Sequence, residues 1–530
     1  MLSRRQFVAG AGSSAAAVVL APQALADGLT SARRAPLLRA GRFREGVMSG
    51  DPAPRAITLW TRLDDVERSG SVRLEVARDR GFRRVVASQK IGTSERMGGS
   101  VKARVAGLRP HEQYYYRFET ARNESPVGRF RTALPADSEQ PVRFAFFSCQ
   151  DFTHGYYNAH EVLAEEDIDF VVCLGDYIYA EAYHEKGKTG VRNDPVKFSK
   201  TLQEYRDKYA LYRSDKALRK VQGNFPMVTI WDDHEVQDNY AGQEDDGGLP
   251  ANLAFSRRRQ RRAYQAFFES MPTYGGGRSG TRIYRGLKFG KTVDLLMLDQ
   301  RQYRADQPCN DAVAPPCADY DQPREFLGST QREWLKKRLG SSNAAWKVIG
   351  NEVLITPARV VGGSFFTFDG WYGYPREREE ILQHIKSKGI KDVVFVTGDI
   401  HIFIAGDVRT QLGAGESVAL EFVGGSITSQ NLGETTIDAG GGVTIPGNDA
   451  NPKTPQGLID ALRGFNPGVD NAEFDHHGYG LVKATMDEFD VTLKRIETIK
   501  RRSTALLPDQ GFRWTVKRGQ TSIKGVNGPA

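Results

Sequence analysis

Side chains that can bind a metal ion follow several apolar runs of this 530-residue sequence. The four richest stretches are Ser148-Cys149-Gln150-Asp151, "GDYIY" ending at Tyr179, "WDDHE" ending at Glu235, and Gly398-Asp399-Ile400-His401. A fifth run ends in Asn351. In α/β sheets the carboxyl ends of the strands converge on one crevice, so these ends can meet in space. One such motif is more often a helix cap or a core residue, but five in a chain with only 9 histidines indicate a shared site.

The chemistry served by such a cluster is metal-assisted displacement at phosphorus. Two neighbouring cations need a shared ligand, and a carboxylate with two oxygens is a natural bridge, which is the role we expect for Asp176. A thiolate and a phenolate are strong anionic donors, so Cys149 and Tyr179 favour iron at one position, with His401 completing that set. The second position is expected to take oxygen donors suited to calcium, manganese or magnesium, namely Asp233, Asp399 and either Asn351 or Asn239.

The elements that must position these residues fall into two parts. From residue 41 to 133, short extended segments are separated by Gly, Pro and charged turns, which predicts a small antiparallel β-sandwich. After a polar linker at 133–142, apolar runs alternate with helical segments, which predicts a layered α/β domain over residues 142–507. We expect residues 508–530 to form a C-terminal tail that could act as a lid.

The N-terminus has the features of an export signal. Two arginines precede an apolar stretch that is too short to span a membrane, and "ALA" at 24–26 is a small-residue cleavage pattern, so residues 1–26 are predicted to be removed. The stretch "SRRQF" also resembles the twin-arginine signal. This resemblance implies passage through the twin-arginine translocase, and we expect a soluble periplasmic or secreted protein.

Charge content indicates which partners to expect, and the cysteines indicate where a disulfide can form. The 73 basic and 65 acidic residues leave a mild excess of +8, and no Lys/Arg tract is interleaved with aromatic residues, so we expect no stable nucleic-acid partner. We expect the protein to be a monomer. In an oxidising compartment Cys309 and Cys317 are expected to form a local disulfide, whereas Cys173 lies in an apolar run and is expected to be a core residue.

The order of the motifs resembles that of the calcineurin-like metallophosphoesterase superfamily, whose strand ends carry D-x-H, G-D-x-x-D/Y, G-N-H-D/E, H and G-H-x-H. Here Cys149 stands at the first Asp, Asp233-His234-Glu235 stand for Asn-His-Glu, Asn351 replaces the lone His, and Asp399-Ile400-His401 replace His-x-His. With "GDYIY", "WDDHEV", "LDQRQYR" and "DHHGYG", these changes resemble the PhoD-type alkaline phosphatases, which are related to an iron-dependent phospholipase D. The resemblance implies an α/β fold, a layered α/β/β/α sandwich preceded by a fibronectin type III-like β-sandwich.

The resemblance also implies a set of metal ligands. Family members hold a ferric ion through Cys, Asp, Tyr and His, which correspond here to Cys149, Asp176, Tyr179 and His401. A neighbouring calcium ion is implied at Asp176, Asp233 and Asp399, and Mn²⁺ or Mg²⁺ are alternatives for this second metal. The nucleophile that we expect is a hydroxide held by the metal, because a bound cation brings the acidity of water near neutral.

Three further residues are candidates for handling the substrate. His234, acting with Asp233 and Asp176, is expected to protonate the leaving oxygen or to orient the substrate, and the alternative is that it only supports Asp233. Asn239 could reach the phosphate instead of a metal ion. Arg301, in "LDQRQYR", could clamp the phosphate in a bidentate manner, although an arginine at a strand end more often makes a structural ion pair.

These inferences predict an exported, metal-dependent phosphoesterase that hydrolyses small phosphomonoesters, phosphodiesters or both at alkaline pH. An alternative is a phospholipase D, or a diesterase acting on teichoic or nucleic acids, with a phospholipid or a polymeric phosphodiester as its substrate. A remoter alternative is a non-catalytic binding protein in which the β-sandwich is the functional part.

Overall fold

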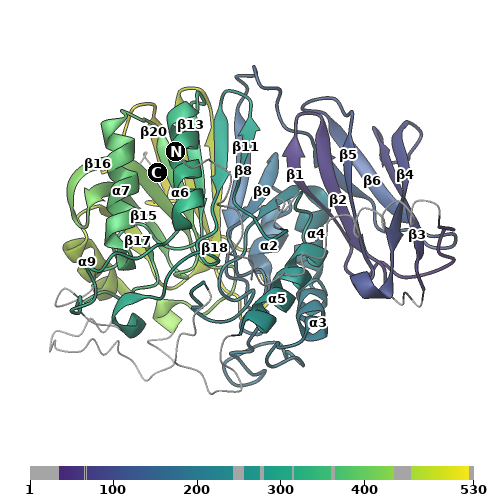
Figure 1. Cartoon of the computed structure of the whole chain (residues 1–530), viewed down its shortest axis with the longest axis horizontal. Coiled ribbons are helices and arrows are strands. Elements are labelled where there is room, and N and C mark those ends of the chain that lie inside the picture. The colour runs from purple at the N-terminus through teal and green to yellow at the C-terminus, as the bar shows by residue number, and fades with distance from the viewer. Residues whose placement is uncertain are drawn as a thin grey trace, which may run out of the picture.

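The computed structural model describes residues 35–64, 66, 68–242, 256–274, 280–312, 315–359, 364–434 and 455–524. The signal peptide expected at residues 1–26 lies outside these ranges. A β-sandwich formed by the N-terminal strands adjoins a larger body of sheets and helices (Figure 1). Within the described ranges, no helix combines the length and the apolar character needed to cross a membrane.

The N-terminal part is a sandwich of two layers of strands. One layer is a four-stranded sheet in the order β4-β3-β6-β7, formed by Val85–Thr93, Gly70–Ala77, Gln113–Glu119 and Gly128–Arg131. The other layer contains β1, β2 and β5, at Val47–Ala53, Ala56–Arg62 and Ser100–Ala106. Apolar side chains of both layers, among them Leu59, Val72 and Phe118, form one buried cluster. The expected β-sandwich is therefore present.

The sandwich is continuous with the larger body. β1 pairs in parallel with β10 (Pro226–Thr229), so one layer of the sandwich extends a nine-stranded sheet in the order β20-β19-β18-β8-β9-β10-β1-β2-β5. A Cβ atom on Gly50 would lie 2.6 Å from the carbonyl oxygen of Met227, so the close approach of these two strands requires glycine. The two parts of the chain thus share a sheet as well as a linker.

The strands that lead to Cys149, Asp176 and Asp233 lie in the middle of this sheet. β8 (Val142–Phe147), β9 (Phe170–Cys173) and β10 run parallel, with β9 between the other two. The antiparallel strands of the far edge are β18, β19 and β20, at His477–Ala484, Glu488–Ile496 and Arg513–Lys517. β20 belongs to the tail that was expected as a lid. That expectation is wrong for these residues, because β20 pairs with β19 and buries Trp514 at the sheet edge.

The second sheet has seven strands in the order β11-β12-β13-β14-β16-β15-β17. They are Arg285–Phe289, Val293–Met297, Trp346–Asn351, Val393–Thr397, Ala414–Gly424, Phe403–Gln411 and Val469–Glu473. Side chains alternate along its strands: Leu295 and Met297 join the core that includes the first sheet, whereas Leu296 joins a cluster with helix residues. This period of two places one face of the sheet against the first sheet and the other against helices.

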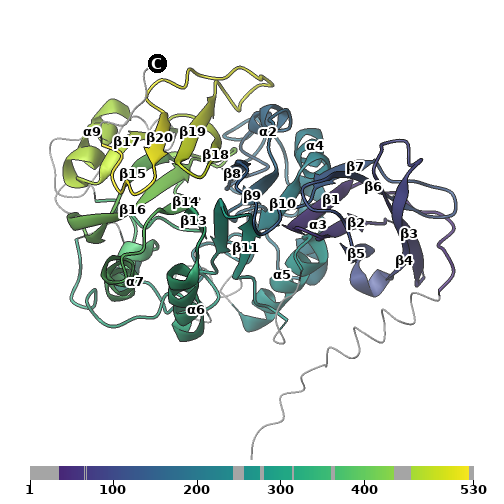
Figure 2. The ribbon, with the colours of Figure 1, turned by 90° about the horizontal axis from the view of Figure 1, so that it is seen from above.

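Helices cover the outer faces of both sheets. α6 (Gly328–Ser341) and α7 (Pro375–Ser387) pack on the seven-stranded sheet through side chains such as Leu335 and Ile381, while α2 (Asn158–Leu163) and α4 (Lys216–Asn224) lie against the nine-stranded sheet (Figure 2). The other α-helices of the described ranges are α3, α5 and α9, at Leu202–Tyr212, Arg257–Ser270 and Pro455–Phe465. The succession of helices, sheet, sheet and helices confirms the predicted α/β/β/α sandwich.

Candidate metal centre

The chain turns sharply where the site strands end. Five predicted site residues adopt left-handed backbone conformations with positive φ: Cys149 (57°), Asp176 (51°), Asn239 (48°), Asp399 (66°) and His401 (58°). Such conformations cost about 1–3 kcal/mol each for residues other than glycine and gather at functional sites, where the rest of the fold enforces them. The fold thus accepts backbone strain at the points from which the predicted ligands project.

The four residues predicted to hold iron lie together. Tyr179 Oη donates a hydrogen bond to Asp176 Oδ2 (3.0 Å) and lies 3.2 Å from His401 Nε2. Ligand atoms of Cys149, Asp176 and His401 all lie within 4.8 Å of one another. Ser429 Oγ donates to Tyr179 Oη (2.6 Å), so the phenol oxygen has a fixed position. Sulfur, phenol, carboxylate and imidazole donors converge here from three different strand ends.

His401 has the tautomer that a metal ligand needs. Its Nδ1 lies 2.8 Å from the carbonyl oxygen of Gln430, which can only accept, so Nδ1 carries the proton. The lone pair of Nε2 therefore faces Tyr179 and the rest of the cluster. Burial lowers the pKa of His401 to about 4, which keeps the ring neutral near physiological pH. A backbone carbonyl that fixes the ring in this way is typical of histidines that bind metal ions.

A second group of side chains, mostly carboxylates, lies next to the first. Asp233 lies within 4.8 Å, ligand atom to ligand atom, of Asp176 and His234, and also of Asp232 and Asp399. Asp176 is therefore shared by the sulfur-containing group and by the group with Asp233 and His234. This is the geometry expected of a carboxylate that bridges two cations.

The charge balance of the centre favours cations. Burial, with the nearby charges of Asp233 and Asp232, raises the pKa of Asp176 well above its ordinary value, and burial with Asp232 and Asp369 does the same for Asp399. Several carboxylates so close together cannot all ionise unless positive charge is added. The donor set and this need for positive charge both fit metal ions, with Cys149, Tyr179 and His401 on one side and oxygen donors on the other.

His234 lies against Tyr179 and Glu181. Its ring stacks on Tyr179 with centroids 4.1 Å apart, and its Nδ1 lies 3.2 Å from Glu181 Oε2. Burial lowers its pKa, but the charges of Asp233 and Asp176 outweigh this and raise the pKa of His234 well above its usual value. Its Nε2 is 3.8 Å from Asp233 Oδ2, beyond hydrogen-bond distance. The imidazolium thus has one N–H held by Glu181 and a second directed toward the carboxylates.

Arg301 does not have the role predicted for it. The side chain is fully buried, its Nε pairs with Asp232 and its Nη1 donates to Asp369 Oδ1 (2.9 Å). Its Nη2 lies 2.8 Å from Asp369 Oδ2 and 3.4 Å from carboxylate oxygens of both Asp233 and Asp399. Each nitrogen of the guanidinium faces a protein carboxylate, so the prediction of a phosphate clamp is wrong. Arg301 instead fixes the position of the carboxylates at the centre.

The two asparagines differ in position. Asn351 is fully buried, and its Oδ1 accepts from Gln300 Nε2 (2.7 Å) and Trp371 Nε1 (2.9 Å). Because both lone pairs of this oxygen are used, the prediction that Asn351 binds a metal ion is wrong. Asn239 does lie at the centre, since its backbone N–H donates to Asp233 Oδ2 (2.6 Å).

Three carboxylates that support the site were not predicted from the sequence. Glu235 accepts hydrogen bonds from the backbone N–H groups of Asp176 (3.1 Å), Tyr177 (2.7 Å) and Asp232 (2.8 Å), and so joins two strand ends. Glu235 belongs to the "WDDHE" motif, where its place could have been expected. Glu181, which holds His234, and Asp369, which holds Arg301, lie in segments without a catalytic pattern.

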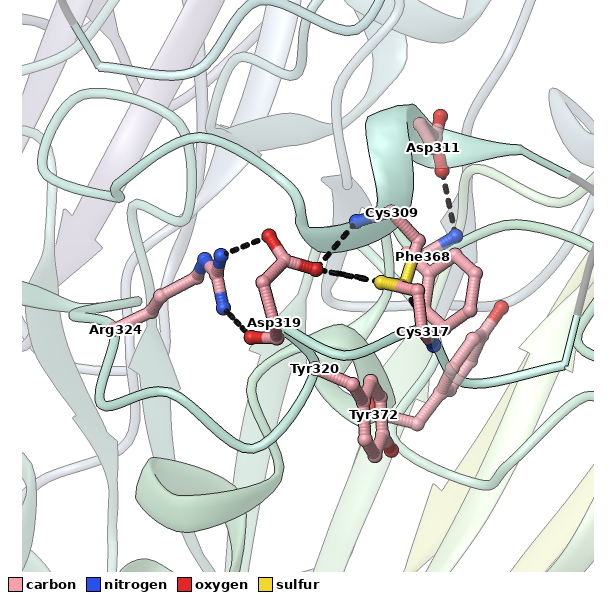
Figure 3. The surroundings of a disulfide bond; sticks show 8 residues. All are labelled: Cys309, Asp311, Cys317, Asp319, Tyr320, Arg324, Phe368 and Tyr372. Atoms are coloured by element: carbon pink, nitrogen blue, oxygen red, sulfur yellow. Dashed lines mark hydrogen bonds and ion pairs between the residues drawn. A yellow bond between two sulfur atoms is a disulfide. The ribbon is translucent and has the colours of Figure 1, made fainter.

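The expected disulfide is present and lies near the centre. Cys309 and Cys317 are bonded with an S–S distance of 2.03 Å, and the bond closes a loop that carries Asp311 (Figure 3). Asp311 accepts from the backbone N–H of Phe368 (2.5 Å) and from Asn239 Nδ2 (2.9 Å). The loop is therefore connected through Asn239 to Asp233. A disulfide is consistent with an extracytoplasmic protein.

A two-sheet α/β sandwich whose strand ends bring sulfur, phenol, imidazole and carboxylate donors together defines a metallophosphoesterase. Comparison with protein families agrees: the PhoD-like phosphatase family matches residues 144–493, and the N-terminal domain of PhoD-like phosphatases matches residues 29–134. The chain therefore belongs to the PhoD-like phosphatase family.

Individual relatives support this placement. Alkaline phosphatase D of Bacillus subtilis (strain 168) is 38% identical over 449 residues, which cover 81% of this chain and 77% of that protein. A solved structure of PhoD is 31% identical, with a TM-score of 0.81 over 92% of both chains. The purple acid phosphatase PPD1 from yellow lupin seeds, 12% identical, shares the fold with a TM-score of 0.50 over 85% of this chain and 71% of that one. The predicted family, fold and enzyme class are confirmed, and this kinship implies a metal-ion centre.

Proposed function

We propose that this enzyme hydrolyses small phosphate esters at a mixed Fe³⁺/Ca²⁺ centre outside the cytoplasm. The observation that carries the proposal is the position of Asp176, which belongs to the group with Cys149 and His401 and also to the group with Asp233. A thiolate, a phenolate and an imidazole on one side of this carboxylate favour iron. Carboxylates on its other side favour a hard cation such as calcium.

In this proposal each predicted ligand except Asn351 has a defined place. Fe³⁺ would be held by Cys149, Asp176, Tyr179 and His401, and Ca²⁺, or Mn²⁺ or Mg²⁺ in its place, by Asp176, Asp233 and Asp399. Bound there, the ions would lower the pKa of a water molecule and offset negative charge on the phosphoryl oxygens. Asn239, held beside Asp233 through its backbone N–H, is assigned a contact with the phosphate.

His234 is assigned the role of proton donor to the leaving oxygen. Glu181 fixes its Nδ1, and stacking on Tyr179 fixes the plane of its ring, so Nε2 can direct its proton at a substrate held beside Asp233. The test is the dependence of rate on the leaving group. His234→Asn should slow an alkyl phosphate, whose leaving oxygen needs the proton, far more than a nitrophenyl phosphate. Equal losses for both substrates would leave His234 as a support for Asp233.

The central experiment measures hydrolysis of paired chromogenic phosphomonoester and phosphodiester substrates at alkaline pH, together with the iron content of the protein. We expect activity to fall with a calcium chelator, to return when calcium is added, and to require bound iron. The ratio of the two rates separates a phosphomonoesterase from a diesterase. If the fully metallated protein hydrolysed neither substrate, a phospholipid or polymeric diester would be tested next, and failure on all of them would contradict the proposal.

We also propose that the protein is exported folded by the twin-arginine translocase and acts as a monomer in the periplasm or outside the cell. The support is the "SRRQF" stretch and the disulfide. Replacing both arginines of the stretch by lysine should retain active enzyme in the cytoplasm. Unchanged export of that variant would contradict the twin-arginine route.

A further inference from the structure

A second group of coordinating side chains lies beside the candidate metal centre. It consists of His154 between β8 and α2, Glu434 after β16, and His477 at the start of β18. Glu434 Oε2 lies 3.7 Å from His154 Nε2 and 3.3 Å from His477 Nε2. Both histidines are buried, and none of the three residues belongs to the ligand set proposed for iron or calcium.

The hydrogen bonds of the two histidines turn Nε2 of each ring toward the same carboxylate. Nδ1 of His154 lies 2.7 Å from the carbonyl oxygen of Thr428, so this nitrogen carries the proton and Nε2 does not. Nδ1 of His477 lies 2.9 Å from Ser426 Oγ, whose own proton is donated to the carbonyl of Ser429 (2.7 Å). Ser426 Oγ therefore accepts from His477 Nδ1, and His477 Nε2 faces Glu434 Oε2 at 3.3 Å, where it donates when protonated and is a free ligand atom in the neutral ring.

The lone pair of His154 Nε2 and the Glu434 carboxylate repel each other unless a cation lies between them. Lys500 supplies one, with its Nζ 2.6 Å from His154 Nε2 and 3.4 Å from Glu434 Oε1. The Lys500 side chain is 45% exposed and is carried by the segment after β19, so it can move into solvent. The ammonium group thus marks a position that a metal ion of higher charge could occupy.

The same segment builds both groups of ligands. The carbonyl oxygen of Gln430 fixes the tautomer of His401, and two residues earlier the carbonyl oxygen of Thr428 does the same for His154. In each case Nε2 is turned away from the segment toward other donor atoms. Two imidazoles and one carboxylate form a donor set that suits zinc and similar divalent transition ions.

We propose that His154, Glu434 and His477 form a second transition-metal site that binds Zn²⁺ or a similar divalent ion, with Lys500 as the cation that occupies it when metal is absent. The test is to equilibrate the wild type and variants with Zn²⁺, remove loosely bound metal, and count zinc per chain. His477→Ala and Glu434→Gln should each hold one zinc ion fewer than the wild type. His384→Ala, which changes a histidine on the distant helix α7, should match the wild type.

Asp176→Asn separates the two sites. It should lose metal from the candidate metal centre and retain the zinc ion assigned to His154, Glu434 and His477. If Asp176→Asn lost that ion, or if His477→Ala held as much zinc as the wild type, the proposal would be overturned. Thermal melts without zinc show whether each variant is folded, and added zinc should raise the melting temperature of Asp176→Asn but not that of Asp176→Asn combined with His477→Ala.

Lys500→Met is an independent test, because it should change zinc binding in the direction opposite to His477→Ala and Glu434→Gln. Removing a cation that competes with the metal should strengthen zinc binding at this site by about tenfold. If the group is only an ion-pair cluster, Lys500→Met should lower the melting temperature and leave the zinc content and affinity unchanged. That outcome would also overturn the proposal.

Discussion

Two sets of buried carboxylates lie side by side in this enzyme and are neutralised differently. Asp369 is paired with Arg301 and Arg304, and although burial raises its pKa, the two guanidinium groups hold the pKa well below the usual range. Asp176 has no guanidinium among its described contacts. Burial raises its pKa well above the usual range, and the nearby charge of His234, which lowers the pKa, does not outweigh this. The fold therefore supplies guanidinium groups directly to the carboxylate that anchors the centre, whereas Asp176 keeps a raised pKa that metal ions would offset.

This difference predicts opposite consequences of mutation for the two sets. Breaking a buried ion pair leaves an uncompensated charge and weakens the fold. Removing one carboxylate from the crowded centre relieves repulsion and should weaken only metal binding and catalysis. Stability without metal and activity with metal are thus the two measurements that separate an anchor from a ligand.

The largest effect is expected for Asp176→Asn. A neutral amide cannot bridge two cations, so we expect loss of metal and a fall in kcat/KM of at least about 10⁴-fold, or roughly 5 kcal/mol. The melting temperature of the metal-free protein should stay level or rise, because one buried like charge is gone. Elemental analysis, kinetics and a melt in chelator test this. A large loss of stability in the metal-free variant would place Asp176 among the anchors.

The next largest effect is expected for Arg301→Gln. Asp232 and Asp369 would lose their main partner in a fully buried position, and we expect the free energy of unfolding to fall by about 3–5 kcal/mol even without metal. Urea unfolding of the metal-free protein measures this. Arg376→Gln, at an exposed position on α7, is the control and should change stability by less than about 0.5 kcal/mol. A stable Arg301→Gln variant with a raised KM would restore the rejected phosphate clamp.

The outcome for Arg301 shows where reasoning from the sequence ended. The layers of the fold could be predicted because apolar runs and turns repeat locally, and Cys149, Asp176 and His401 could be placed because strand ends converge. The errors concern partners from other elements. Nothing near Arg301 in the sequence indicates Asp369, and nothing near Asn351 indicates that Trp371 uses its oxygen. Residue type and strand position predict which groups gather, but hydrogen bonds across elements decide which remain available.

A smaller effect is expected when Cys309 and Cys317 are both replaced by serine. The disulfide closes a short loop, and its loss should lower the free energy of unfolding by about 2–3 kcal/mol. The rate of the folded enzyme should change by no more than a few-fold, because Asp311 is held by the N–H of Phe368 as well as by the loop. Denaturant melts and kinetics on the same samples test this. A loss of activity without a loss of stability would make the loop part of the centre.

The smallest effect is expected for Cys173→Ser. Cys149→Ser, at the adjacent strand end, is the matched variant for a thiol that lies among the predicted metal ligands. Both thiols are fully buried, but Cys173 packs in the apolar core, whereas Cys149 lies with Asp176 and His401. A buried hydroxyl in place of the Cys173 thiol should cost about 1 kcal/mol of stability and leave iron content and kcat/KM nearly unchanged. Cys149→Ser should instead reduce iron content and activity with little change in metal-free stability. Burial and residue type are the same at both positions, and only the neighbouring donors differ. If the two variants exchanged these behaviours, iron would therefore have to be assigned to ligands other than Cys149.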